Sequence, residues 1–223
     1  MFINLGNPSP KSAPSVYPSR IKFGFSRFIE LEAPRALNAK FSEVLEARRS
    51  ADSLIAADLD DVSSVLAHSC RPRCATNSSA RRMWESRPSP SAGGTHSIDL
   101  LLLNLSQFPD AVWQYDPWSH GIGEISLFGP THARRLIKIA LDVFDQPEAV
   151  VVWFVGQPHI LSAFYENPES LLWRDAGALL STLYLVIGAL GLKCRALGPS
   201  GSPVVEDVLG PSLVGLGGLL FGK

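Results

Sequence analysis

The stretch PSAGGTHSIDLLLL, residues 90–103, joins a loop of small residues directly to an apolar strand pattern. Ile98 and the run Leu100–Leu103 predict a buried strand, because a short apolar block that follows turn residues is typical of a sheet core. The loop consists of Pro90, Ser91, Ala92, Gly93 and Gly94. Small residues let backbone N–H groups approach a flat ring system closely. An ordinary turn at the entrance of a strand is the alternative interpretation.

A basic cluster lies upstream of this loop, at the end of a helix pattern marked by Phe41 and Val44. It consists of Arg48, Arg49 and Ser50. Guanidinium groups bind a phosphate through paired, charge-assisted hydrogen bonds, and a serine hydroxyl adds a further donor. Basic residues also complement the partial negative charge at a helix C-terminus, so the cluster has a structural alternative.

The composition predicts a single globular domain. The 223 residues are 46% hydrophobic and 18% charged, with a formal net charge of −1. This charge balance argues against nucleic acid as a partner. Three cysteines cannot form a secreted disulfide framework, and the N-terminus has no long apolar stretch, so we expect no signal peptide and a cytoplasmic location.

Cys70 and Cys74, close to His68, suggest a metal site at first sight. A structural zinc ion needs four ligands at fitting spacing, and the chain has no second cysteine pair. We therefore expect no metal.

The residue pattern divides the chain into an arm and a domain. Residues 1–28, which begin rich in proline and serine, are expected to form a mobile arm, and residues 29–223 the folded domain. We expect an extended lead-in at 29–35 and a polar loop over 69–95. Strands are expected at 98–105, 111–115, 149–155 and 194–197, and helices before residue 48, from 58 or 60 to about 67, and over 131–144, 170–191 and 203–209.

A run of 17 uncharged residues, AGALLSTLYLVIGALGL, lies between Asp175 and Lys193. Its length is at the lower limit of a membrane span. The run contains Ser181, Thr182 and three glycines, and no other segment is comparable. We favour a helix that is buried on all sides at the centre of a domain or a dimer.

These motifs, in this order, resemble the nitroreductase family of flavin enzymes, and within it the SagB-type dehydrogenases that oxidise peptide heterocycles. Tyr115-Asp116 and His120 match a further part of the pattern. Three later segments also match the pattern, namely Asp175-Ala176-Gly177, Ala189-Leu190-Gly191-Leu192 and Leu197-Gly198.

The resemblance implies an α+β fold, namely a three-layer α/β/α sandwich with a mixed, mainly antiparallel sheet and a long buried central helix. It also implies FMN, held between the two subunits of a homodimer. Arg48, Arg49 and Ser50 would bind its phosphate, and the loop 90–94 would contact its ring. Leu197 and Gly198 are the candidates for a backbone contact near flavin N5. Lys223 could add charge at the phosphate, although a terminal lysine is more often solvated.

Two positions depart from the family pattern. Asp52 stands where the family has another basic residue. Phe164-Tyr165 stands where azoline-oxidising relatives have a lysine–tyrosine pair. Tyr165 can transfer a proton and is our candidate catalytic residue. Phe164 cannot transfer a proton, and core packing is the alternative to a substrate contact.

The function that these observations predict is that of an FMN-dependent oxidoreductase that passes hydride through flavin N5. Its substrate would be a small molecule or peptide, such as a peptide-derived or other natural-product intermediate. A non-catalytic flavin-binding or partner-binding subunit with the same fold is one alternative, and an NAD(P)H-dependent nitroreductase is another. The chain has no P-loop or dinucleotide-binding signature, so a nicotinamide donor would stack directly on the flavin.

Overall fold

The computed structural model describes residues 5–12, 18–78 and 82–223, so the expected arm lies partly outside the described residues. Its centre is a seven-stranded sheet in the order β10-β11-β8-β5-β6-β7-β2, in which each neighbouring pair is antiparallel. The strands are β2 (Phe25–Glu30), β5 (Ile98–Leu103), β6 (Trp113–Asp116), β7 (Gly121–Ile125), β8 (Val150–Gly156), β10 (Lys193–Leu197) and β11 (Val214–Gly222).

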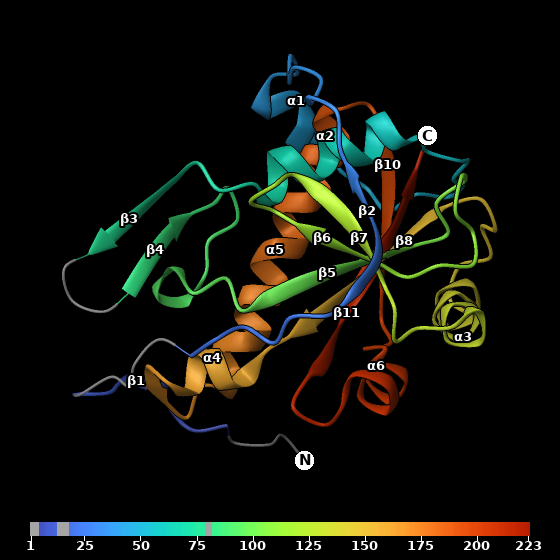
Figure 1. The fold of residues 1–223 in the computed structure, drawn as a ribbon. Helices are drawn as coiled ribbons and strands as arrows, with labels where there is room; N and C mark the ends of the chain where they lie inside the picture. The colour runs from blue at the N-terminus through green and yellow to red at the C-terminus, as the bar shows by residue number, and fades with distance from the viewer. Residues whose placement is uncertain (1–4, 13–17, 79–81) are drawn as a thin grey trace.

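Helices cover both faces of this sheet and complete three layers, as Figure 1 shows. One face packs against α2 (Leu59–Cys70) and α5 (Glu169–Ala189). The other packs against α3 (Pro130–Leu141) and α6 (Ser202–Leu209). Alternate residues of the central strands pack into the cores on the two faces of the sheet, because successive side chains of a strand point to opposite faces. The expected α+β sandwich is confirmed.

Short elements surround this body. They are α1 (Phe41–Ala47), α4 (Pro158–Ser162), the 3-10 turn η1 (Ala92–Gly94), the pair β1 (Ser9–Pro10) and β9 (Tyr165–Glu166), and the hairpin β3 (Cys74–Ser78) and β4 (Arg82–Ser86). Figure 1 shows the hairpin standing out from the body. The expectation of a polar loop over 69–95 is therefore wrong, since the end of α2, the hairpin and η1 occupy most of the described part of it.

Local chemistry fixes the boundaries of the main elements. Asp58 caps α2: its carboxylate accepts from the Asp61 N–H at 2.9 Å, and Asp61 accepts in return from the Asp58 N–H at 3.1 Å. All seven residues of β8 are buried, as its β-branched run predicts. Gly191 follows α5 with a φ of 75°, a conformation that glycine adopts without strain and that ends helices.

The folded body begins earlier in the chain than the expected boundary at residue 28. Residue 28 lies within β2, and the segment before β2 is packed. The Arg20 guanidinium donates to Asp99 at 3.3 Å, and the Ile21 N–H donates to the Gln157 side chain at 2.8 Å. Phe23 is buried in the core on the α3 side. These contacts join residues 20–28 to the domain.

One face of α5 is not covered by the chain itself. Trp173, Gly177, Ser181 and Gly188 are exposed along it, at intervals of one or two turns. We call these four residues the open stripe of α5. Among the described residues, α5 is the one helix long and apolar enough to cross a membrane by length and composition, and its buried residues face the sheet. The expected burial on all sides is thus not reached within a single chain.

Candidate functional site

The basic cluster lies beside a cavity of about 540 Å³, which we call the arginine cavity. Its wall comes from α1 and the segment after it, from α5, and from residues 191–194. Arg48 and Arg49 are both on this wall and both exposed. In the described part of the chain neither guanidinium has an ion-pair partner. The cavity therefore offers two charged hydrogen-bond forks to a ligand.

Tyr184 of α5 organises the inner side of the arginine cavity. Its hydroxyl lies 3.5 Å from the Ser50 hydroxyl and accepts from the Ala196 N–H at 2.8 Å. The centre of the Arg48 guanidinium lies 5.9 Å from the centre of the Tyr184 ring, within the range of a cation–π contact. Tyr184 thus links the basic cluster to β10, and the sequence analysis did not identify it.

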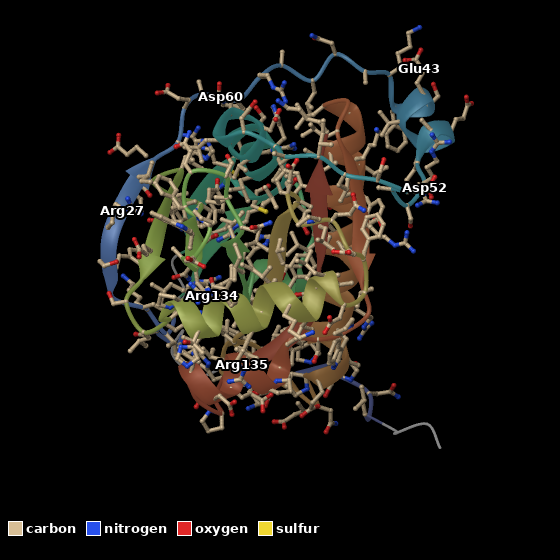
Figure 2. All side chains as sticks on the ribbon, turned by 90° about the vertical axis from the view of Figure 1, so that its right-hand side faces the viewer. Arg27, Glu43, Asp52, Asp60, Arg134 and Arg135 are labelled. Atoms are coloured by element: carbon tan, nitrogen blue, oxygen red, sulfur yellow. The ribbon has the colours of Figure 1, made fainter. Side chains whose placement is uncertain are left out.

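Asp52 and Lys193 also belong to the wall of the arginine cavity. Figure 2 shows Asp52 at the outer surface, close to the region of α1 that carries Glu43. A carboxylate here lowers the positive potential that the arginines create. Lys193 adds a cation, and the sequence analysis did not single it out.

The loop 90–94 is held by a carboxylate of α5. Asp175 accepts from the Ser91 hydroxyl at 2.6 Å and from the Ala92 N–H at 2.9 Å. Burial raises the pKa of Asp175, and these two donors oppose the shift. Gly93 and Gly94 adopt φ of 55° and 61°, which explains the need for glycine at both positions. The contact joins two parts of the family-like pattern that are far apart in sequence.

Ser91 and Asp175 line a second cavity, of about 460 Å³, which we call the loop cavity. Its wall is made by the segment before β2, the end of α2, the segments 87–91 and 96–100, residues 114–118, Gln157 and two residues of α5.

The two cavities share no wall residue, and α5 spans both. Asp175 and Leu179 reach the loop cavity, whereas Tyr184 and Gly188 reach the arginine cavity. Asp175 and Gly188 are separated by about 20 Å along the helix axis at 1.5 Å per residue. Within one chain, the predicted phosphate site and the predicted ring contact therefore line different cavities.

The remaining cofactor candidates lie at the end of the chain. Leu197 is buried at the end of β10, and an added Cβ at Gly198 would meet open space. The Lys223 ammonium lies 2.7 Å from Asp58 and 3.1 Å from Asp61, so it is engaged at the start of α2. Lys223 is not on the wall of the arginine cavity.

The candidate catalytic pair lies between α4 and α5. Phe164 is buried, and Tyr165 is half-buried in β9, where its backbone pairs with Pro10 of β1. Neither residue is on the wall of either cavity. Within the described residues no group of three or more metal-ligating side chains is present, and Cys70 is buried whereas Cys74 is exposed.

Sequence reasoning did not assign the contacts of two buried histidines. His96, at a φ of 45°, has its Nε2 3.0 Å from the Glu85 carbonyl, and burial lowers its pKa to about 4. His120, at a φ of 53°, lies between the Tyr115 hydroxyl, 2.9 Å from Nδ1, and the Ser63 hydroxyl, 3.0 Å from Nε2. Burial lowers the His120 pKa as well. His120 was noted only as part of the family pattern.

Comparison with known proteins places the fold. No protein-family model and no curated protein matches the sequence. Among solved structures, a candidate nitroreductase from Ralstonia eutropha JMP134 superposes with a TM-score of 0.67 at 17% identity, over 97% of this chain and 98% of that one. One from Anabaena variabilis ATCC 29413 gives 0.69 at 19% identity, over 88% of this chain and 41% of that one.

The Escherichia coli microcin synthetase McbBCD complex, which was solved with truncated pro-MccB17 bound, also matches. The TM-score is 0.56 at 14% identity, over 86% of this chain and 75% of that one. At these identities the likeness concerns the backbone arrangement alone. The chain therefore has the fold of the nitroreductases.

Proposed function

We propose that this protein is an FMN-dependent oxidoreductase of the nitroreductase family that works as a homodimer, with FMN between the subunits. The observation that carries the proposal is the position of the arginine cavity beside the open stripe of α5, which Gly188 shares with the cavity wall. A second copy seated on that stripe would bring its own loop 90–94 toward the arginine cavity. This arrangement would unite the two half-sites that one chain keeps apart.

The residues of the arginine cavity fit a phosphate monoester. Arg48 and Arg49 are exposed guanidiniums, and such groups bind phosphate through paired charge-assisted hydrogen bonds. Ser50 is not on the cavity wall, but its hydroxyl lies 3.5 Å from that of Tyr184 and would add a donor, and Lys193 on the wall would add a further cation. Lys223 would contact the phosphate only after breaking its ion pairs with Asp58 and Asp61, so we expect it to contribute least to phosphate binding.

Bound FMN would supply hydride transfer at N5. The chain would position that reaction through the backbone of Leu197 and Gly198 and through the loop from Pro90 to Gly94. Tyr165 is the proposed proton-transferring group, since a phenol can donate or accept a proton. We propose a peptide-derived or other natural-product intermediate as the substrate, and a cytoplasmic location without a nucleic-acid or membrane partner. An NAD(P)H-dependent nitroreductase reaction uses the same site and is the alternative chemistry.

A second candidate function is a non-catalytic subunit that binds flavin or a protein partner. Two observations favour it: Asp52 is on the wall of the arginine cavity, and Phe164 is a buried side chain without a proton to transfer. Flavin binding without turnover would be the signature of this alternative.

The proposal is tested by the visible absorbance of the purified protein and of two variants. Wild-type protein is expected to carry or take up FMN, and Arg48→Ala is expected to bind it roughly 10- to 150-fold more weakly, the value of one hydrogen bond to a charged group. Arg134→Ala is the matched control, because Arg134 is an exposed arginine on α3, on the opposite face of the sheet.

Wild-type protein that stays colourless and does not take up added FMN would refute the proposal. Equal flavin affinity in Arg48→Ala and Arg134→Ala would instead place the phosphate elsewhere. Tight flavin binding without turnover on azoline peptides or on nitroaromatics with NAD(P)H would favour the non-catalytic subunit.

A further inference from the structure

A second anchor holds the loop 90–94, besides Asp175 of α5. It is Arg20, which lies in the segment before β2 and within the arm expected from the sequence. Arg20 is on the wall of the loop cavity together with Pro90 and Ser91 of the loop. The anchor is therefore remote in sequence from every motif of the family-like pattern, yet it lies beside the loop in space.

The Arg20 guanidinium binds the stretch of chain that directly follows the loop. Its Nη2 donates to the Thr95 carbonyl at 3.1 Å and also to the His96 carbonyl. Its Nη1 donates to the Asp99 carboxylate, in β5, at 3.3 Å. A guanidinium presents its donors as a rigid planar fork, so one side chain fixes these three acceptors relative to one another.

Gln157 connects this anchor to the sheet. Gln157 directly follows β8 and is fully buried. Its side-chain oxygen accepts from the Ile21 N–H at 2.8 Å, and its side-chain nitrogen donates to the same Asp99 carboxylate that pairs with Arg20. Its backbone N–H donates to the Ser97 carbonyl at 2.8 Å. The position of the Arg20 side chain is thus set by the rigid body, because buried hydrogen-bond networks of this kind are strong.

The backbone that Arg20 binds has an unfavourable conformation. His96 has a φ of 45°, and a residue other than glycine keeps such a φ only where its surroundings enforce it. The His96 N–H donates to the Ser91 hydroxyl at 2.9 Å, while Arg20 binds the carbonyl of the same residue. Ser91 in turn donates to Asp175. A continuous chain of contacts therefore joins Arg20 to the loop and to α5.

Arg20 acts on the chain itself and not on a ligand. Its side chain is 22% exposed, and both of its terminal nitrogens donate to groups of the protein. Arg48 and Arg49 differ in this respect, since both are exposed and have no ion-pair partner among the described residues. Removal of Arg20 would release the loop without removing a ligand contact.

We propose that Arg20 is a positioning residue of the flavin site, which holds the loop 90–94 in the conformation that contacts the flavin ring. The proposal rests on the proposed function, to which the ring contact belongs. It makes the segment before β2 a working part of the site.

FMN and riboflavin separate an effect on the ring from an effect on the phosphate, because riboflavin has the same ring and no phosphate. Arg20→Ala is expected to weaken the binding of both flavins by the same factor, roughly 5- to 150-fold, the usual size of coupling between two sites. Arg48→Ala is expected to weaken FMN binding alone. Titration of flavin fluorescence with the full-length protein measures the dissociation constants.

Two further variants separate positioning from general stability. Arg20→Lys keeps the charge but lacks the planar fork, so its flavin affinity should lie between those of Arg20→Ala and the wild type. It also allows the test if Arg20→Ala does not fold. Leu136→Ala is the matched control, because Leu136 is buried on α3 and is on the wall of neither cavity. It should lower stability and leave both flavin affinities unchanged.

A second readout needs no flavin. Backbone order parameters from ¹⁵N relaxation are about 0.85 for a rigid backbone and below about 0.6 for a flexible one. In flavin-free Arg20→Ala, the loop 90–94 is expected to pass from the first range to the second. The strand β8 should stay rigid and serves as the internal reference.

Four results would overturn the proposal: unchanged FMN affinity in Arg20→Ala, a loss of FMN affinity without an equal loss of riboflavin affinity, an equal loss in Leu136→Ala, and a loop in Arg20→Ala that is as ordered as in the wild type. Wild-type protein that binds neither flavin would refute the proposed function instead. The order parameters would then decide whether Arg20 positions the loop.

Discussion

At the scale of single residues, buried polar side chains connect segments that are distant in sequence. His96 is an example: it occupies a positive φ, lies on the wall of the loop cavity and approaches the Glu85 carbonyl. Its neutral form is favoured by burial first and by the neighbouring Arg87 charge second. The folded protein must therefore resist protonation of this ring.

Acid should destabilise the protein through His96. The folded pKa of about 4 lies below the ordinary value of 6.5, so this contribution is fully present above pH 6.5 and is lost as the pH falls toward 4. His96→Asn removes the titrating group and tolerates the positive φ. Urea unfolding at pH 7 and pH 4 should show a smaller loss of unfolding free energy in the variant than in the wild type. Parallel losses would contradict the assignment.

A second residue prediction concerns Tyr165. Tyr165→Phe should slow substrate turnover roughly 10²–10⁴-fold, the usual contribution of a proton-transferring group, and leave bound flavin unchanged. Turnover is measured with azoline peptides and with nitroaromatics plus NAD(P)H. Tyr165 is not on the wall of either cavity within one chain. Unchanged turnover in Tyr165→Phe would mean that another residue transfers the proton.

At the scale of elements, α5 has the largest part in the arrangement, since it borders both cavities and carries the open stripe. The sequence predicted this helix to within two residues at each end, because its long apolar run has a clear limit at Gly191. The strand β11 was not predicted, because it contains several glycines, which have a low propensity for strands. The structure explains one of them: a Cβ at Gly218 would lie 2.0 Å from the Val152 carbonyl oxygen.

The open stripe provides a prediction at this scale. Ser181→Arg should convert the proposed homodimer to monomers and lower flavin affinity at the same time, because a buried unpaired charge at an interface is costly. Sedimentation velocity and flavin absorbance follow both effects. Thr131→Arg on α3, at an exposed position on the other face of the sheet, is the control. A dimer that survives Ser181→Arg would show that α5 is not the interface.

At the scale of the whole molecule, the fold was more predictable than the site. Apolar periodicity and turn residues act locally, so they identified most of the helices and four of the strands, whereas the three layers were expected only from the family resemblance. The division of the site into two cavities depends on how far apart Arg48 and Ser91 come to lie, and no local pattern reports that distance. The contacts of Asp175, Tyr184 and His120 also depend on how distant segments come together, so no local pattern predicts them.

The limits of the folded body give a prediction for truncated chains. Removal of residues 1–17 should leave a stable protein. Removal of residues 1–24 should cost several kcal/mol more, because Phe23 burial contributes about 2 kcal/mol and the partners of Arg20 and Ile21 would lose their bonds. Chemical denaturation of both truncated proteins measures the difference. Equal stability would place the domain boundary after residue 24.

The bond from the Ala92 N–H to Asp175 has a consequence for measurement. This amide proton is bonded to a side chain of α5, not to a neighbouring strand, so it can exchange with solvent only when the loop and the helix separate. Its exchange rate in deuterated water therefore reports how often the loop and α5 separate. A ligand that stabilised either segment would slow the exchange of this amide proton. Binding of such a ligand would thus be detected without a label or a substrate.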